Sequence, residues 1–116
     1  KRVKMNWYNY SQLKNFIFNM DIIINCTSIG FGQMKNKSPI NLNILKKIKK
    51  KVIIYDVIYN PQKTKLIKNS QLLRLNTLNG SLMNIFQAVL GFVYVNKNIK
   101  KKDVNKIESL MMSAAK

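Results

Sequence analysis

The order of apolar and polar residues divides the chain into short strands and helices. Residues 21–25 and 52–55 are apolar at nearly every position and rich in β-branched side chains, which is typical of strands buried on both faces. A third short strand is predicted at residues 73–76. Elsewhere apolar residues recur every three or four positions and predict helices over 13–20, 42–48, 64–70, 82–95 and from 103 onward. Ser11, Thr64 and Asp103 can cap three of these helices.

Strands that alternate with helices at this spacing predict βαβ units and a parallel sheet. We expect helices on both faces of that sheet, with Met83, Phe86, Leu90 and Phe92 of the long helix in the core, and Met111 and Met112 in helix packing. A G-x-G-x-x-G loop after the first strand is missing, because Gly30-Phe-Gly32 lacks the third glycine. The expected fold class is therefore α/β: a partial doubly wound, Rossmann-like parallel sheet with flanking helices, whose first half-domain is missing.

Small and polar residues gather where the predicted strands end. Segments 25–28, 56–61 and 77–80 supply hydroxyl groups, amides, a carboxyl group and a glycine. In parallel sheets of this class ligands bind beyond the carboxyl ends of the strands. These three segments are therefore the candidate binding site.

Composition narrows the chemistry available at such a site. The chain has 116 residues, 21 Lys plus Arg, 4 Asp plus Glu, one Cys and no His. The missing His excludes His acid/base catalysis and His metal ligands, the single Cys26 excludes a disulfide framework, and no metal is expected. The net charge of +17 attracts anions. However, almost all of the basic residues are Lys, and they are interleaved with Asn and Ile, a composition that an AT-rich genome would encode. We do not expect nucleic-acid binding.

Apolar runs in the sequence stay far below the roughly 20 residues that span a membrane. No membrane association is expected, and the predicted location is the cytoplasm, or the plastid stroma if the source has a plastid. The chain begins at Lys1 without a Met, so the sequence leaves open whether a segment precedes it.

Three segments together resemble the shikimate dehydrogenase family. Asp21-Ile-Ile-Ile-Asn-Cys-Thr-Ser-Ile-Gly30 is similar to the family's D-h-h-I-N-A-T-S/P-h-G segment, where h is apolar. Tyr55-Asp-Val-Ile-Tyr-Asn-Pro61 with Thr64 resembles its Y-D-x-x-Y-x-P-x-x-T segment. Asn79-Gly-Ser-Leu-Met-Asn-Ile-Phe-Gln87, continuing through Phe92, resembles its N-G-x-x-M-L-x-x-Q-x-x-x-A-F helix. Cys26 stands where the family usually has Ala, and Asn84 where it usually has Leu.

The resemblance implies a role for each matching residue at a cofactor and substrate cleft. It implies that NADP is bound by Asn25, Thr27, Ser28, Val57 and Gly80, and the small-molecule substrate, shikimate or 3-dehydroshikimate, by Tyr59 and Gln87. Considered without the resemblance, several of these residues could have purely structural roles. Thr27 and Ser28 can cap a turn, Tyr59 can be a half-buried aromatic, and Gly80 can belong to a turn or helix cap.

The same resemblance implies the C-terminal portion of a shikimate dehydrogenase, an enzyme of aromatic amino acid biosynthesis. Residues 1–79 would be the second half of the NADP-binding domain, and 80–116 helices that pack back toward an absent substrate domain. The family's catalytic Lys/Asp pair, its Gly-rich loop and its 2′-phosphate motif lie upstream, so no catalytic residue is expected here and the fragment itself is expected to be inactive. The alternatives are a quinate or quinate/shikimate dehydrogenase, and a non-enzymatic remnant that binds polyanions through residues 46–51 and 97–102.

Overall fold

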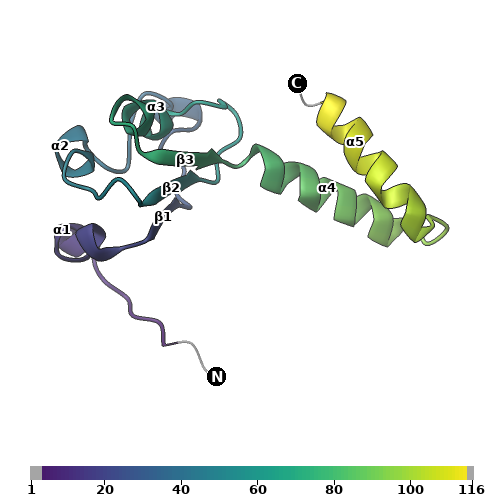
Figure 1. The fold of residues 1–116 in the computed structure, drawn as a ribbon, viewed down its shortest axis with the longest axis horizontal. Helices are drawn as coiled ribbons and strands as arrows, with labels where there is room; N and C mark the ends of the chain where they lie inside the picture. The colour runs from purple at the N-terminus through teal and green to yellow at the C-terminus, as the bar shows by residue number, and fades with distance from the viewer. Residues whose placement is uncertain (1–3, 115–116) are drawn as a thin grey trace.

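The computed structural model describes residues 4–114 and contains a three-stranded parallel sheet (Figure 1). The strands β1 (Ile22–Asn25), β2 (Ile53–Asp56) and β3 (Asn76–Asn79) lie in the order β1-β2-β3. Their register sets Ile22 beside Ile53 and Ile53 beside Asn76. The predicted α/β class with a partial Rossmann-like sheet is therefore confirmed.

Helical segments connect and flank the strands. The α-helices are α1 (Leu13–Phe16), α2 (Leu42–Leu45), α3 (Lys65–Leu72), α4 (Ser81–Val95) and α5 (Val104–Ala114). Short 3-10 helices are η1 (Tyr10–Gln12), η2 (Ile17–Asn19), η3 (Gly32–Met34) and η4 (Lys101–Asp103). Thr64 caps α3 as predicted, its hydroxyl accepting from the Ile67 N–H at 3.3 Å. The prediction for Ser11 is wrong, because Ser11 lies inside η1, whose N-cap is Asn9.

The core lies on one face of the sheet. Ile54 of β2 is fully buried there among apolar side chains of the surrounding segments: Ile17, Ile40, Leu45, Ile48, Leu66 and Leu75. Helices on both faces were expected, and that prediction is wrong for this chain. Successive strands are added in one direction across the sheet, and crossovers of one hand then all fall on the same side.

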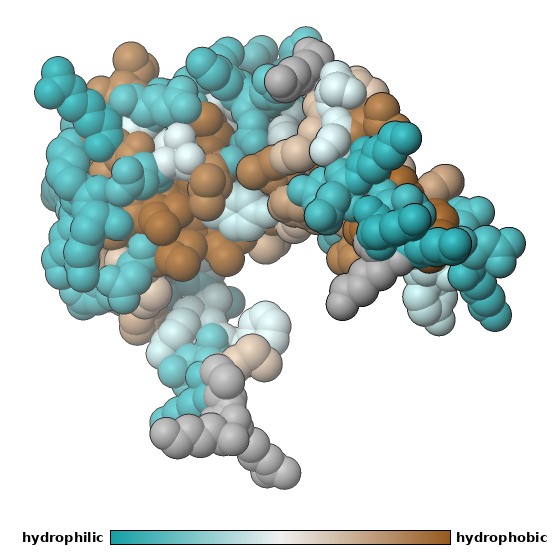
Figure 2. All heavy atoms as spheres, turned by 45° about the vertical axis from the view of Figure 1, so that its right-hand side comes forward, coloured by the Kyte–Doolittle hydropathy of each residue, from teal (hydrophilic) through white to brown (hydrophobic). Residues whose placement is uncertain are grey.

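The opposite face of the sheet is open and apolar. Ile22 and Ile24 of β1 are each 52% exposed and Leu78 of β3 is 54% exposed, so β1 is not buried on both faces as its sequence suggested. Figure 2 shows apolar side chains gathered on the surface of the sheet body. A strand rich in β-branched residues is buried on both faces only when other elements of the chain pack against its second face.

The third strand begins three residues later than predicted. Leu73 and Leu75 look like strand residues, but they follow the end of α3, where Arg74 has a φ of +54°. Leu75 is 6% exposed and points into the core before β3 starts. This connecting segment is apolar because it packs in the core, and its sequence pattern is therefore similar to that of a strand.

Helices α4 and α5 form an arm that leaves the sheet at the end of β3 and folds back on itself (Figure 1). Val89 is buried on α4, whereas Phe86, Leu90 and Phe92 are 42%, 66% and 47% exposed. Their predicted place in the core is therefore wrong here; Met83, Met111 and Met112 are half-buried. The radius of gyration is 17.2 Å, against about 13 Å for a compact domain of this length.

The open face predicts self-association of the isolated chain. We expect the purified chain to sediment as mixed oligomers and to unfold without a sharp transition, because an apolar face and the free edge of β1 invite pairing. Replacing Ile24 and Leu78 together with Thr should reduce association, whereas Ile54→Thr on the covered face should unfold the sheet. Analytical ultracentrifugation and thermal unfolding test this. A monodisperse monomer with a cooperative transition would contradict it.

Candidate functional site

Three polar side chains stand in one row at the carboxyl edge of the sheet. Asn25, Asp56 and Asn79 are the last residues of their strands, and the register pairs Asn25 with Asp56 and Asp56 with Asn79. The Asn25 side-chain amide donates to Asp56 Oδ1 at 3.1 Å. Asn79 Nδ2 donates to the Gln62 carbonyl at 3.0 Å, and Asn79 Oδ1 accepts from the Ser81 N–H at 3.2 Å. Each strand thus ends in a side chain that fixes a loop.

Asp56 is the fully buried centre of this row. Its carboxyl oxygens accept from Asn25 Nδ2, from the Ile58 N–H at 3.2 Å and from the Thr64 hydroxyl at 2.7 Å. These bonds join β1, the loop after β2 and the cap of α3. Asp56 therefore has a structural role, and its buried oxygens are all directed at protein donors.

Asn25 positions the loop that follows β1. It is 5% exposed; its amide nitrogen also donates to the Ile29 carbonyl at 3.1 Å, and its oxygen accepts from the Thr27 hydroxyl at 2.7 Å and the Thr27 N–H at 3.1 Å. Thr27 and Ser28 are exposed at the end of this arrangement. The Thr27 hydroxyl is held by Asn25 and accepts from the Ile29 N–H at 3.2 Å, so the Ser28 hydroxyl is the more open of the two to a ligand.

Gly80 lies against the backbone of Val57. A Cβ at position 80 would be 1.9 Å from the Val57 carbonyl oxygen and 2.5 Å from its carbon. The Gly80 N–H donates to the Ile58 carbonyl at 3.2 Å, and the Val57 N–H donates to the Asn25 carbonyl at 3.2 Å. The structure therefore brings Asn25, Val57 and Gly80 together. Gly80 has a φ of −74°, so close backbone contact, and no positive φ, requires glycine here.

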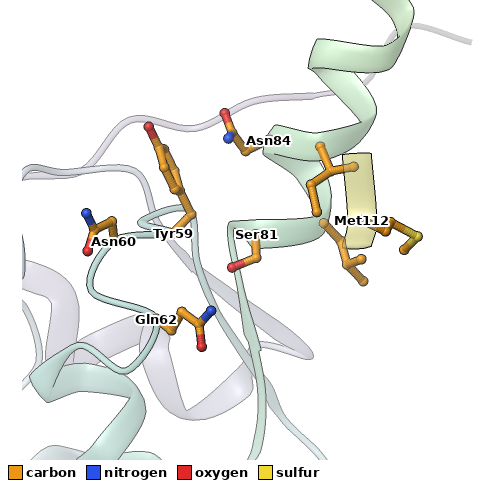
Figure 3. A pocket seen from close by; sticks show the side chains of 8 residues that line it. Tyr59, Asn60, Gln62, Ser81, Asn84 and Met112 are labelled. Atoms are coloured by element: carbon orange, nitrogen blue, oxygen red, sulfur yellow. The ribbon is translucent and has the colours of Figure 1, made fainter. Parts of the chain in front are cut away.

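A cavity of about 780 Å³ opens between the loop after β2 and the helical arm (Figure 3). Tyr59, 51% exposed, is the predicted substrate residue that lines it. The other lining residues are Asn60, Gln62, Ser81, Leu82, Asn84, Ile85 and Met112. Asn60 falls within the candidate segment 56–61, whereas the sequence did not assign Gln62, Ser81 or Asn84 to the site, although Asn84 is polar where the resembled family has Leu.

Gln87 lies outside this cavity wall. It is exposed on α4 about two turns beyond Gly80, so the two residues share roughly one helix face, as their spacing predicts. Although the surrounding helix is largely apolar, the Gln87 amide is not enclosed among apolar side chains in this chain. Its predicted contact with a substrate stays a prediction.

Within residues 4–114, no group of three or more Cys, Asp or Glu side chains could hold a metal ion. None of the helices in this part of the chain is long and apolar enough to cross a membrane.

Fold and site together define a class: part of a Rossmann-like α/β domain with polar loops at the carboxyl edge of its sheet. No protein-family model matches the chain. The shikimate dehydrogenase (NADP⁺) of Pelagibacter ubique is 41% identical over 78% of this chain and 32% of its own length. That of Clostridium botulinum is 40% identical over 65% of this chain and 28% of its own length.

Solved structures show the same likeness. A chorismate mutase/shikimate 5-dehydrogenase fusion protein from Clostridium acetobutylicum superposes with a TM-score of 0.69 and 27% identity, over 91% of this chain and 38% of that one. The Listeria monocytogenes shikimate 5-dehydrogenase, in complex with shikimate and NAD, shares the fold with a TM-score of 0.68 and 23% identity, over 89% of this chain and 34% of that one. A quinate dehydrogenase from Corynebacterium glutamicum, in complex with NAD, gives a TM-score of 0.69 and 25% identity, over 90% of this chain and 35% of that one.

The chain belongs to the shikimate dehydrogenase family, as its three motifs predict. It spans about a third of the length of the curated relatives that it matches.

Proposed function

We propose that the protein to which this chain belongs is an NADP-dependent dehydrogenase that interconverts 3-dehydroshikimate and shikimate, in the cytoplasm or a plastid, on the route to aromatic amino acids. The chain forms one wall of the cofactor and substrate cleft. The observation that carries the proposal is the meeting of Asn25, Val57 and Gly80 at the carboxyl edge of the sheet, in a chain 41% identical to such an enzyme over the aligned residues.

The residues at the sheet edge fit the nicotinamide end of the cofactor. The exposed Ser28 hydroxyl can bind a ribose, and the Thr27 hydroxyl, which donates to Asn25, can accept from one. Val57 is half-buried and offers an uncharged surface for a flat ring, while Gly80 is buried against the Val57 carbonyl and holds that segment in place. In the described residues no Gly-rich loop is present to hold the pyrophosphate, so that half of the cofactor would be bound by other parts of the protein. When bound, the nicotinamide supplies or accepts the hydride.

On the substrate side, the cavity beside the cofactor wall supports the proposal. The Tyr59 phenol lines it and can donate to a substrate carboxylate or hydroxyl. The arm formed by α4 and α5 lies on the other side of the cavity, since Leu82, Ile85 and Met112 also line it. We propose that this arm, within residues 80–116, packs against the domain that supplies the catalytic Lys/Asp pair.

The proposed activity is tested by comparing two proteins. We expect the product of the complete reading frame to reduce NADP⁺ in the presence of shikimate, and the isolated 116-residue chain to give no NADPH. Absorbance at the NADPH band measures both. Shikimate-dependent NADPH formation by the isolated chain would show that the missing residues are not needed, and no activity in either protein would defeat the proposal.

Replacing Gln87 tests its predicted contact with the substrate. In the complete protein, Gln87→Ala should raise the KM for shikimate about tenfold and leave the KM for NADP⁺ unchanged, because a lost hydrogen bond to a hydroxyl group costs on the order of 1 kcal/mol. Gln71→Ala, at an exposed position of α3, is the matched control, since the Gln71 amide donates to the Thr77 hydroxyl away from the cavity. Equal KM values for Gln87→Ala and the parent would assign Gln87 to packing.

Quinate oxidation is the alternative within the same family. The quinate dehydrogenase likeness is no stronger than the likeness to shikimate dehydrogenases. The ratio of kcat/KM for shikimate and quinate, measured with NADP⁺ and with NAD⁺, decides between the substrates and between the cofactors.

Polyanion binding is a second candidate function, and one surface feature favours it. A hollow of about 570 Å³ is lined by Lys35, Lys63, Lys65 and Lys68 with no acidic residue among its lining side chains. Exposed lysines attract phosphate or sulfate groups in a salt-dependent way. Retention of the complete protein on heparin at physiological salt, together with no NADP⁺ binding, would favour this function over the dehydrogenase.

A further inference from the structure

Among the described residues, no charged side chain lines the cavity beside Tyr59, although 21 of the 116 residues of the chain are Lys or Arg. Its polar lining consists of one phenol, one hydroxyl and three carboxamides, from Tyr59, Ser81, Asn60, Gln62 and Asn84. Neutral groups of this kind both donate and accept hydrogen bonds, which suits the hydroxyl groups of a ligand. A phosphate would instead be matched by Lys or Arg.

Asn84 is distinctive within this wall because of the helix that carries it. Helix α4 is apolar along most of its length, yet Ser81, Asn84 and Gln87 recur at intervals of three residues and therefore lie toward one face. Figure 3 shows Asn84 extending from α4 and the Tyr59 ring extending from the loop after β2, both at the cavity.

The Asn84 carboxamide is free to bind a ligand. Its backbone N–H donates to the Gly80 carbonyl at 2.9 Å, but its side chain has no hydrogen-bond partner among the described residues. Asn25 and Asn79 at the sheet edge, by contrast, use both the nitrogen and the oxygen of their side chains to hold loops. The Asn84 side chain thus places a carboxamide at the cavity and makes no hydrogen bond to the other described residues.

We propose that Asn84 is a specificity-determining residue of the substrate site, whose carboxamide binds a ring hydroxyl of the substrate beside the Tyr59 phenol. This inference rests on the proposed function and adds a residue to it. A leucine has nearly the shape of asparagine and no hydrogen-bonding group. Asn84 therefore favours a substrate with a hydroxyl at that place over an analogue without it.

The test uses the complete protein with shikimate and with analogues that each lack one ring hydroxyl. Asn84→Leu should raise the KM for shikimate about tenfold with kcat changed less than twofold. It should also abolish the preference for shikimate over one particular deoxy analogue, and Asn84→Gln should restore part of that preference. A merely structural role would weaken all substrates equally. Unchanged preference for every analogue would overturn the inference.

A matched control and a second measurement separate the possible failures. Asn105→Leu changes an exposed asparagine on α5 that does not line the cavity and should leave all KM values as they are. Shikimate should raise the Tm of the parent more than that of Asn84→Leu. If the parent protein does not oxidise shikimate, the proposed function and this inference are both wrong. If the parent oxidises shikimate and Asn84→Leu has the same KM values as the parent, only the inference is wrong.

Discussion

Gly80→Ala is expected to destabilise the protein by about 3 kcal/mol, because the new methyl group would occupy the place of a backbone carbonyl. The ideal Cβ position is 1.9 Å from the Val57 oxygen, and a main-chain atom cannot move aside as a flexible side chain can. Relief of the overlap would break the bond from the Gly80 N–H to the Ile58 carbonyl. Sequence reasoning predicts that Gly80→Val damages cofactor use in a largely intact fold; the structure predicts damage to the fold as well.

Urea unfolding of the complete protein measures this effect. Gly91→Ala is the control, since no atom lies within 4 Å of its ideal Cβ and the residue is exposed in the middle of α4. That change should stabilise the protein by up to about 1 kcal/mol through helix propensity. If both alanine variants unfold at the same urea concentration, the close contact at Gly80 is not what requires glycine.

Asp56→Ala should cost about 3 kcal/mol or more, because it leaves three buried or partly buried donors without their acceptor. The Asn25 amide, the Ile58 N–H and the Thr64 hydroxyl all lose a bond. Asp56→Asn should cost less, since its remaining oxygen can still accept. Loosening of the Asn25 loop should in addition raise the KM for NADP⁺.

The control is Asp21→Ala, measured by thermal unfolding together with Asp56→Ala. Asp21 pairs with Lys51 at 3.0 Å, but both side chains are largely exposed, at 81% and 70%, so its loss should change the Tm little. Equal Tm losses for the two variants would mean that the row at the sheet edge contributes no more than a surface ion pair.

The sequence predicted those parts of the fold that depend on local pattern. Two strands, the Thr64 cap and the long α4 helix follow from β-branched runs, a hydroxyl before a helix and an apolar period. The start of β3 could not be predicted, because Leu75 is apolar for a reason of core packing. The open face opposite Ile54 could not be predicted either, since a run of isoleucines does not tell which of its faces this chain covers.

The sequence predicted where the site lies in the fold, but it did not predict most of the contacts within the site. Strand ends in a parallel sheet meet at one edge, so Asn25, Val57 and Gly80 could be expected to lie together. The Asn25 side chain forms its hydrogen bonds within the protein, and Gly80 leaves space for the Val57 carbonyl. Both features depend on atomic positions, which the spacing of the motifs does not specify. The same is true of Asn84 and Gln62, which reach the cavity from elements that only the tertiary fold brings together.

The base of the helical arm has a mechanical consequence. Gly80 bonds the Ile58 carbonyl and Asn79 bonds the Gln62 carbonyl, on either side of Tyr59 in the chain. Helix α4 therefore cannot pivot at its first turn without carrying the Tyr59 loop along. The arm and the Tyr59 loop are thus coupled at the base of α4, and Met112, near the C-terminal end of α5, lines the cavity beside the same loop, so the shape of the cavity depends on both ends of the arm.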